Sequence, residues 1–227
     1  MTQQWQSDLD AWAGGWAAIR EDETAQGVRA WNGSLPQDTV AGVELVLVCE
    51  PSDAGTVRDA VVAAGSDVLS TDVLLCGAVQ DLDRGLGFPG DAGLFDAPMG
   101  DWSRFEVDEW GQPVAHSAMS VQEGVAFVGA LHADSSQDRD PAEVLDPLVS
   151  AMANEAFLAD AERLYTVVPE SELPAREAQG WQRVAAVVRC LSANRQGHVP
   201  AEVRTSRGPC RAAEGAASSS WHCAART

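Results

Sequence analysis

The sequence predicts an α+β fold in which a mixed, mostly antiparallel sheet is flanked by helices. Within residues 103–133, apolar and polar side chains alternate in three short segments with turn residues at Gly111 and Gly124, as in consecutive antiparallel strands. On both sides of this block, segments with helical spacing alternate with short apolar runs that are typical of buried strands. The 227 residues suffice for one large domain or for two small lobes.

The N-terminal lobe, residues 1–79, is expected to contain two helices and two strands. The first helix is indicated by apolar residues that recur every three or four positions, namely Trp5, Leu9, Trp12, Trp16 and Ile19. This spacing favours core packing of the tryptophans over an aromatic wall for a cationic ligand. The next predicted elements are a strand over residues 43–49, a helix over 52–64 and a strand over 68–76.

Residues 80–102 are predicted to form a connector, because they are rich in Gly and Asp and contain Pro89 and Pro98. The segment is longer than the about 12 to 15 residues usual for a structureless connection, so we expect a link between lobes or a loop over a site. The core is expected over residues 103–192. Residues 193–227 are expected to be a disordered tail, since few large apolar side chains remain there.

The third predicted strand of the core leads into a helix. Gly129 lies in the middle of that strand, where a glycine often marks a bulge or a close backbone approach. Asp140-Pro141-Ala142-Glu143 then combines an acceptor at the N-cap with Pro and Glu in the first helical turn. Pro147 is expected to kink this helix or to restart it. A strand over 163–168, a helix over 170–179 and a strand over 183–191 complete the core.

The charge balance restricts the partners. The chain has 34 acidic and 15 basic side chains, a formal charge of -19, so nucleic acid and anionic membrane surfaces would be repelled. We therefore expect no nucleic acid and no membrane among the partners. With no apolar run near the about 20 residues of a membrane span and no signal-like start, we expect a cytoplasmic protein. The five cysteines show no zinc-like spacing, and we expect no metal.

Two segments of the core resemble a known family. VDEWGQPVAHSAMSVQEGVAFVGALHAD is similar to the hairpin and central strand of the GNAT N-acetyltransferase superfamily, and RLYTVVP followed by a helix and Gly180-Trp181 is similar to the family's closing elements. The resemblance covers residues 102–191, and residues 5–76 more loosely, as in the two-lobed proteins of actinobacteria. It implies a GNAT-like fold and transfer of an acyl group from acetyl-CoA, a cosubstrate, to a primary amine.

The resemblance also implies a cofactor site. In the family, backbone amides after the central strand hold the pyrophosphate of acetyl-CoA through an R/Q-x-x-G-x-G/A motif. Gln137 and Ala142 match its ends, Asp140 replaces the central glycine, and Arg139 offsets part of the added negative charge. The amides near Gly129 would polarise the thioester carbonyl. The implied cofactor-binding residues are Val128, Gly129, Ala130, Leu131, Gln137, Arg139 and Ala142. A self-capped helix without a phosphate site is the alternative interpretation.

The family's general acid, a tyrosine, has no counterpart at the matching position, which is Arg176. Tyr165 is the only tyrosine and is predicted to be a core residue. The candidate bases that deprotonate the amine lie on the strands of the core, and they are Glu106, Asp108, Glu109, His116 and His132. We take Glu106, Asp108 and His132 as the catalytic candidates. Solvated strand carboxylates and ordinary sheet histidines are the alternative interpretation.

The net charge favours a cationic small molecule or peptide as the acceptor. A homodimer is considered as the oligomeric state. Two other functions stay open. One is a non-catalytic GNAT-fold binding or regulatory protein with a degenerate CoA site, which Asp140 and Arg176 favour. The other is a structural module whose sheet only imitates the order of the family's strands.

Overall fold

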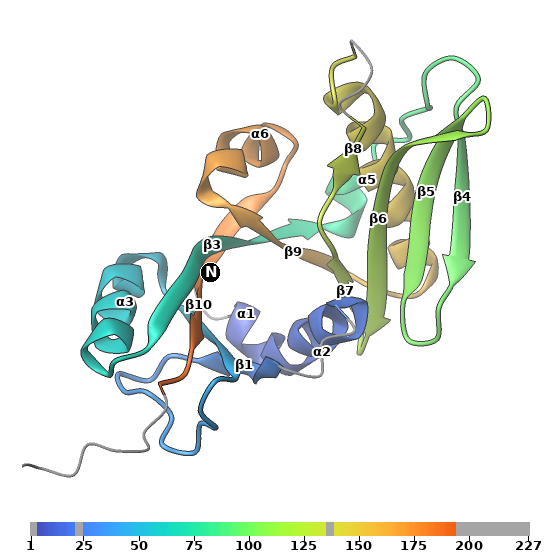
Figure 1. Cartoon of the computed structure of the whole chain (residues 1–227). Helices are drawn as coiled ribbons and strands as arrows, with labels where there is room; N and C mark the ends of the chain where they lie inside the picture. Colours follow the sequence, from blue (N-terminus) through green and yellow to red (C-terminus); the bar gives the residue numbers. More distant parts are fainter. Residues whose placement is uncertain (1–3, 21–24, 135–138, 194–227) are drawn as a thin grey trace, which may run out of the picture. The chain divides into compact units, whose positions relative to one another are not determined.

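The computed structural model describes residues 4–20, 25–134 and 139–193, which belong to one compact unit (Figure 1). Residues 194–227 of the predicted disordered tail lie outside the described residues. Among the helices of the described part, none combines the length and the apolar character that a membrane crossing requires.

A single sheet of ten strands runs through the described part, in the order β1-β2-β10-β3-β9-β7-β6-β5-β4, with β8 paired to β6. The pairs β1–β2 and β7–β9 are parallel, and the other pairs of the described residues are antiparallel. The mixed, mostly antiparallel sheet predicted from the sequence is therefore confirmed. The strands are β1 Ala25–Ala30, β2 Glu44–Cys49, β3 Asp67–Ala78, β4 Gly93–Pro98, β5 Ser103–Glu109, β6 Gln112–Gln122, β7 Val125–Val128, β8 His132–Ala133, β9 Arg163–Pro169 and β10 Gln182–Leu191.

Helices cover both faces of this sheet (Figure 1). The tryptophans of α2 share a core with Phe127 and Tyr165, whereas α5 shares a core with Ala126 and Leu164. Because successive side chains of a strand point to opposite faces, α2 and α5 lie on opposite faces of the sheet. The helical elements are α1 Gln4–Ser7, α2 Leu9–Arg20, η1 Pro51–Asp53, α3 Ala54–Ala63, α4 Val79–Leu82, α5 Ala142–Leu158, η2 Glu170–Glu172 and α6 Leu173–Ala178. Helix α5 continues through Pro147 and does not restart at Asp146.

The tryptophans of the N-terminal helices are core residues, as their spacing predicts. Trp5, Trp12 and Trp16 are buried, and the rings of Trp12 and Trp16 stack on Phe127 with centroids 6.3 and 6.0 Å away. The predicted helix is interrupted at Asp8, whose carboxylate lies in a buried polar cluster with Arg163 and Tyr165.

Gly14 and Gly15 allow α2 to lie directly on the sheet. A Cβ atom on Gly14 would lie 2.5 Å from Oε1 of Gln122, and one on Gly15 would lie 3.0 Å from Cβ of Phe127. Glycine lowers the intrinsic helix propensity of this segment, but here it permits the close contact of α2 with β6 and β7. The contact places the C-terminal turn of α2 beside the functional site described below.

The predicted boundaries at residues 79 and 102 do not separate independent sheets. Strand β3 from the predicted N-terminal lobe pairs with β10 and β9 from the predicted core. The predicted connector, 80–102, contains α4 and the edge strand β4, which pairs with β5. No sequence pattern predicts β4, because an edge strand that is exposed to solvent needs no buried apolar face. Residues 95–98 are all exposed.

Candidate functional site

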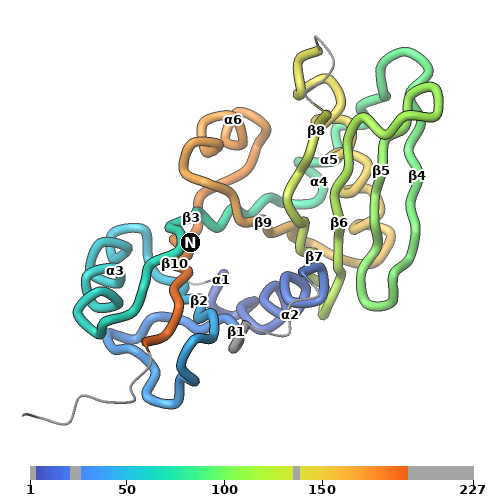
Figure 2. Tube along the Cα trace, in the orientation of Figure 1, coloured from blue at the N-terminus to red at the C-terminus, as the bar shows by residue number. Residues whose placement is uncertain are grey.

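The parallel strands β7 and β9 pair over only three residues and then diverge. The pairs are Val125↔Arg163, Ala126↔Leu164 and Phe127↔Tyr165. Beyond them β9 continues along β3 to Pro169, whereas the chain after β7 continues along β6 (Figure 2). This divergence opens the sheet in its middle.

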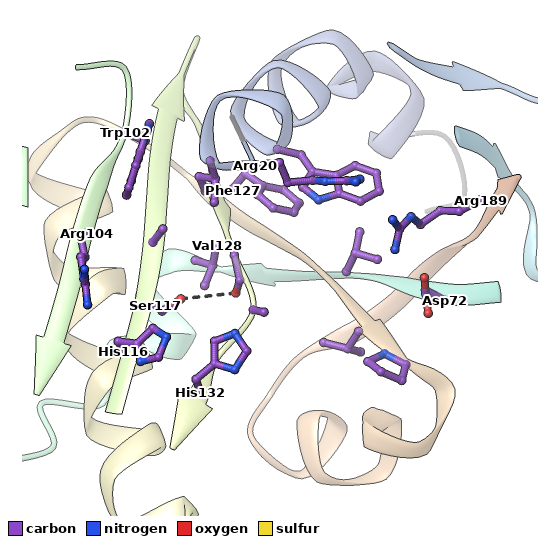
Figure 3. A pocket seen from close by; sticks show the side chains of 18 residues that line it. Arg20, Asp72, Trp102, Arg104, His116, Ser117, Phe127, Val128, His132 and Arg189 are labelled. Atoms are coloured by element: carbon purple, nitrogen blue, oxygen red, sulfur yellow. Dashed lines mark hydrogen bonds between the residues drawn. The ribbon is translucent and has the colours of Figure 1, made fainter. Parts of the chain in front are cut away.

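A cavity of about 620 Å³ lies at this opening. Residues from both diverging strands line it, and the end of α2 contributes further lining residues (Figure 3). The side of β7 and the segment after it contributes Phe127, Val128, Gly129, Ala130 and His132; the side of β9 contributes Val167, Val168 and Pro169; α2 contributes Trp16, Ile19 and Arg20.

A bulge separates β7 from β8. Met119 pairs with Val128, and His116 pairs with His132. The two pairs are three residues apart along β6 but four residues apart along the segment from β7 to β8, so this segment contains one extra residue. Gly129 still donates its N–H to the carbonyl of Ala118 at 2.8 Å, which places the extra residue after it. In the described part of the chain, the amides of Ala130 and Leu131 donate no backbone hydrogen bond. The amide of Ala130, which lines the cavity, is available to a ligand there, whereas Leu131 lies outside the set of lining residues. The bulge that Gly129 indicates in the sequence is present.

A row of polar side chains crosses the sheet beside this bulge. Glu106 on β5 is the cross-strand partner of His116 on β6, which in turn faces His132 on β8. The two imidazoles stack with centroids 4.8 Å apart and both line the cavity (Figure 3). Burial lowers the pKa of His116, His132 and Arg104 lower it further, and Glu106 acts in the opposite direction. His116 is therefore favoured in its neutral, proton-accepting form.

The structure places the three catalytic candidates differently. His132 lines the cavity, and Glu106 lies next to it through His116 and accepts a hydrogen bond of 2.7 Å from Arg104. Asp108 instead accepts the N–H of Gly111 at 2.7 Å and so stabilises the β5–β6 turn. Within the described residues, no group of three or more His, Cys, Asp or Glu side chains has the arrangement of a metal site.

The opposite side of the cavity carries charged residues that no sequence motif marks. Arg20, Asp72 and Arg189 come from α2, β3 and β10, and only the strand order brings them together. Arg20 and Arg189 bind Glu44 at 3.1 and 2.6 Å. Although burial raises the pKa of Glu44, the hydrogen bonds from the two arginines lower it below its ordinary value, so the carboxylate is ionised at neutral pH.

The start of α5 is self-capped. A carboxylate oxygen of Asp140 accepts the N–H of Ala142 at 3.0 Å, and the Asp140 carbonyl accepts the N–H of Glu143 at 3.0 Å. Arg139 binds Glu109 at 3.0 Å and approaches Glu143 at 3.7 Å, while Gln137 lies outside the described residues. A pyrophosphate at this position would have to displace the Asp140 carboxylate. The capped start of α5 therefore does not fit the pyrophosphate of acetyl-CoA as it stands.

Tyr165 and Arg176 both lie outside the set of residues that line the cavity. Tyr165 is buried and its hydroxyl donates to Asp8 at 2.8 Å, and burial raises the pKa of this phenol strongly. Arg176 is buried as well and binds Glu172 at 2.8 Å and Gln179 at 3.2 Å. Tyr165 is thus a core residue, as the sequence predicts.

Comparison with known proteins identifies the fold. No family model matches the chain, and no curated protein matches it. Among solved structures it is similar to a GCN5-related N-acetyltransferase from Kribbella flavida, with 19% identity and a TM-score of 0.50 over 68% of this chain and 70% of that one. A GCN5-related N-acetyltransferase from Sphaerobacter thermophilus matches with 10% identity and a TM-score of 0.49 over 66% of this chain and 59% of that one. The first similarity and the strand order agree: the described part of this chain has the fold of the GCN5-related N-acetyltransferases.

Proposed function

We propose that this protein is an N-acyltransferase that transfers an acyl group from an acyl-CoA thioester to a primary amine in the cavity between β7 and β9. The observation that carries the proposal is the divergence of these strands beside a bulge whose two amides have no backbone partner in the described residues. Amides fixed in this way stabilise the negative charge that develops on a carbonyl oxygen during acyl transfer.

Each part of the site has a distinct task in this proposal. The amide of Ala130, which lines the cavity, donates to the carbonyl oxygen, with the amide of Leu131 next to it in the bulge, and Val128 and Gly129 form the adjoining wall. The stacked pair His116 and His132 accepts the proton that the amine loses as its nitrogen bonds to the carbonyl carbon. The carbon–sulfur bond then breaks and the thiolate leaves. Glu106, the cross-strand neighbour of His116, stabilises the imidazolium that forms.

A second function is favoured by the start of α5. Asp140 occupies an amide that a phosphate would need, and the position of the family's tyrosine carries Arg176, which is held by Glu172. These features suit a protein that binds a small molecule in the cavity without transferring an acyl group.

Calorimetric titration of the full chain with acetyl-CoA and with S-acetylpantetheine, which lacks the nucleotide and pyrophosphate, distinguishes these functions. We expect both thioesters to bind with similar affinity, because the phosphate position is capped while the opening that accepts the thioester is not. Release of free thiol in the presence of a panel of primary amines then supports transfer. Binding without thiol release supports the second function, and no heat with either thioester at millimolar concentration would reject the proposed transfer.

A further inference from the structure

The charge of the cavity wall differs from that of the whole chain. The chain has 34 acidic and 15 basic side chains, yet the cavity is lined by three arginines, Arg20, Arg104 and Arg189, and by one carboxylate, Asp72. The net charge of the whole chain favours a cationic acceptor, but a bound ligand contacts the residues that line the cavity. The wall presents more hydrogen-bond donors for an anionic group than carboxylates for a cationic one.

Arg104 is the arginine best placed for an acceptor. Arg20 and Arg189 share the buried Glu44, which holds them on the far side of the cavity. Arg104 binds Glu106 through Nη2 at 2.7 Å, its only side-chain hydrogen bond within the described residues, and its side chain is 53% exposed. A guanidinium has five N–H donors in one plane, so most donors of Arg104 remain for a ligand.

The position of Arg104 in the sheet places it near the histidine pair. It faces Ala118 on β6, two residues from His116, so the two side chains are diagonal neighbours. Such neighbours are about 7–8 Å apart at the backbone, within reach of long side chains. The electrostatic effect of Arg104 on His116 agrees with this proximity. Between them the cavity floor consists of small residues, Ala118 and Gly129, which leave room for a ligand.

We propose that the acceptor is an amine that carries a carboxylate close to its amino group, as an amino acid does. The guanidinium of Arg104 binds the carboxylate, and the amino group then lies beside His116 and His132. This inference rests on the proposed function for the transfer step, but the carboxylate contact itself is independent of acetyl-CoA. It replaces the cationic acceptor that the net charge suggests.

Binding of N-acetylated products to the full chain tests the contact without any transfer. The probes are N-acetylglycine, N-acetyl-L-leucine and N-acetyl-L-phenylalanine, each compared with its carboxamide by calorimetry. We expect the carboxylate to bind about tenfold tighter than the carboxamide in at least one pair, the size expected of a charge-assisted contact. Arg104→Gln should abolish this preference, whereas Arg104→Lys should retain part of it. Arg84→Gln is the matched control, because Arg84 forms a comparable ion pair with Asp146 outside the cavity lining.

Equal binding of carboxylates and carboxamides in all three pairs would overturn the inference, and so would a preference that survives Arg104→Gln. Consumption of acetyl-CoA in the presence of the free amino acids and their amides separates this inference from the proposed function. A carboxylate preference in binding with no consumption would reject the transfer and leave the carboxylate contact standing. Consumption with the amides but not the amino acids would reject the contact and leave the transfer standing.

Discussion

His116 and His132 face each other across β6 and β8, and their imidazole rings stack with centroids 4.8 Å apart on the wall of the cavity. The contact depends on the bulge after Gly129, because the extra residue shifts the register by one position and brings His132 opposite His116. At this distance, a proton on one imidazole disfavours binding of a second proton to the other. This coupling suits a pair that accepts one proton from an amine.

The titration of His116 tests this coupling. Burial, His132 and Arg104 lower the pKa of His116, so we expect the imidazole to titrate below about 6.5, the ordinary value for histidine. His132→Asn should raise the pKa of His116 by removing the electrostatic effect of the neighbouring imidazole, and Glu106→Gln should lower it. Proton NMR on the full chain measures both, with His116→Asn to assign the signal among the four histidines. An unchanged pKa in both variants contradicts the coupling.

The lowered pKa of His116 also makes the stability of the protein depend on pH. The folded state binds the His116 proton less tightly than the unfolded state, so this group's contribution to stability is present above the unfolded pKa of about 6.5 and is lost as the pH falls through the folded value. The wild type should therefore lose more unfolding free energy than His116→Asn between neutral and mildly acidic pH. Parallel losses in the two proteins, measured by urea unfolding, contradict this assignment.

Asp140→Asn should tighten the binding of acetyl-CoA. Asparagine also caps helices, so the first turn of α5 keeps its partner while one negative charge near the phosphate position is removed. A charge at a helix start is worth about 0.3–1 kcal/mol, which corresponds to an increase in affinity of about twofold to fivefold at low salt. Glu155→Gln, which removes a charge from an exposed position near the other end of α5, is the control. Equal effects of the two substitutions, or none, would show that the charge of Asp140 does not weaken phosphate binding at this helix start.

Gly129→Ala should destabilise the protein by about 1 kcal/mol, as small overpacking does. The added Cβ would lie 3.2 Å from Cγ2 of Ile19 and 3.5 Å from the Ala118 carbonyl oxygen. Adding Ile19→Ala should remove the steric part of the effect, so the two substitutions should be non-additive in the free energy of unfolding. Gly55→Ala, where an added Cβ meets nothing within 4 Å on α3, should instead stabilise by about 0.5–1 kcal/mol. Strict additivity at residues 19 and 129 would argue against the close contact of α2 with the bulge.

Tyr165→Phe should reduce stability by about 1–3 kcal/mol, because the buried Asp8 loses the hydroxyl as a hydrogen-bond donor. It should leave the kcat/KM of acyl transfer unchanged within about a factor of two, since Tyr165 lies outside the set of lining residues and burial keeps its phenol protonated. Thermal unfolding and steady-state rates measure the two effects. A large rate loss in a variant of unchanged stability would instead make Tyr165 part of the chemistry.

Much of the fold was predictable because its elements carry local signals. The spacing of Trp5, Trp12 and Trp16 predicts the buried face of α1 and α2, and the Asp140 cap predicts the start of α5. No local pattern predicts strand β4, because it is an exposed edge strand. None predicts the break at Asp8 either, because its partners Arg163 and Tyr165 are far away in the sequence.

The candidate site was predictable only in part. Gly129 indicates a bulge in the sequence, and the structure has one directly after this residue. Arg20, Asp72 and Arg189 reach the cavity from three separate elements, and no spacing along the chain relates them. The pairing of His116 with His132 likewise depends on register, which a one-residue bulge changes without altering the apolar pattern.

Titration of the full chain with S-acetylpantetheine measures thioester binding in the opening between β7 and β9 without any contribution from phosphates. We expect saturable binding that Gly129→Val weakens, because the larger side chain narrows the cavity, and that Asp140→Asn leaves unchanged. Binding that is insensitive to Gly129→Val, or no heat at millimolar concentrations of the probe, would contradict a thioester site between β7 and β9.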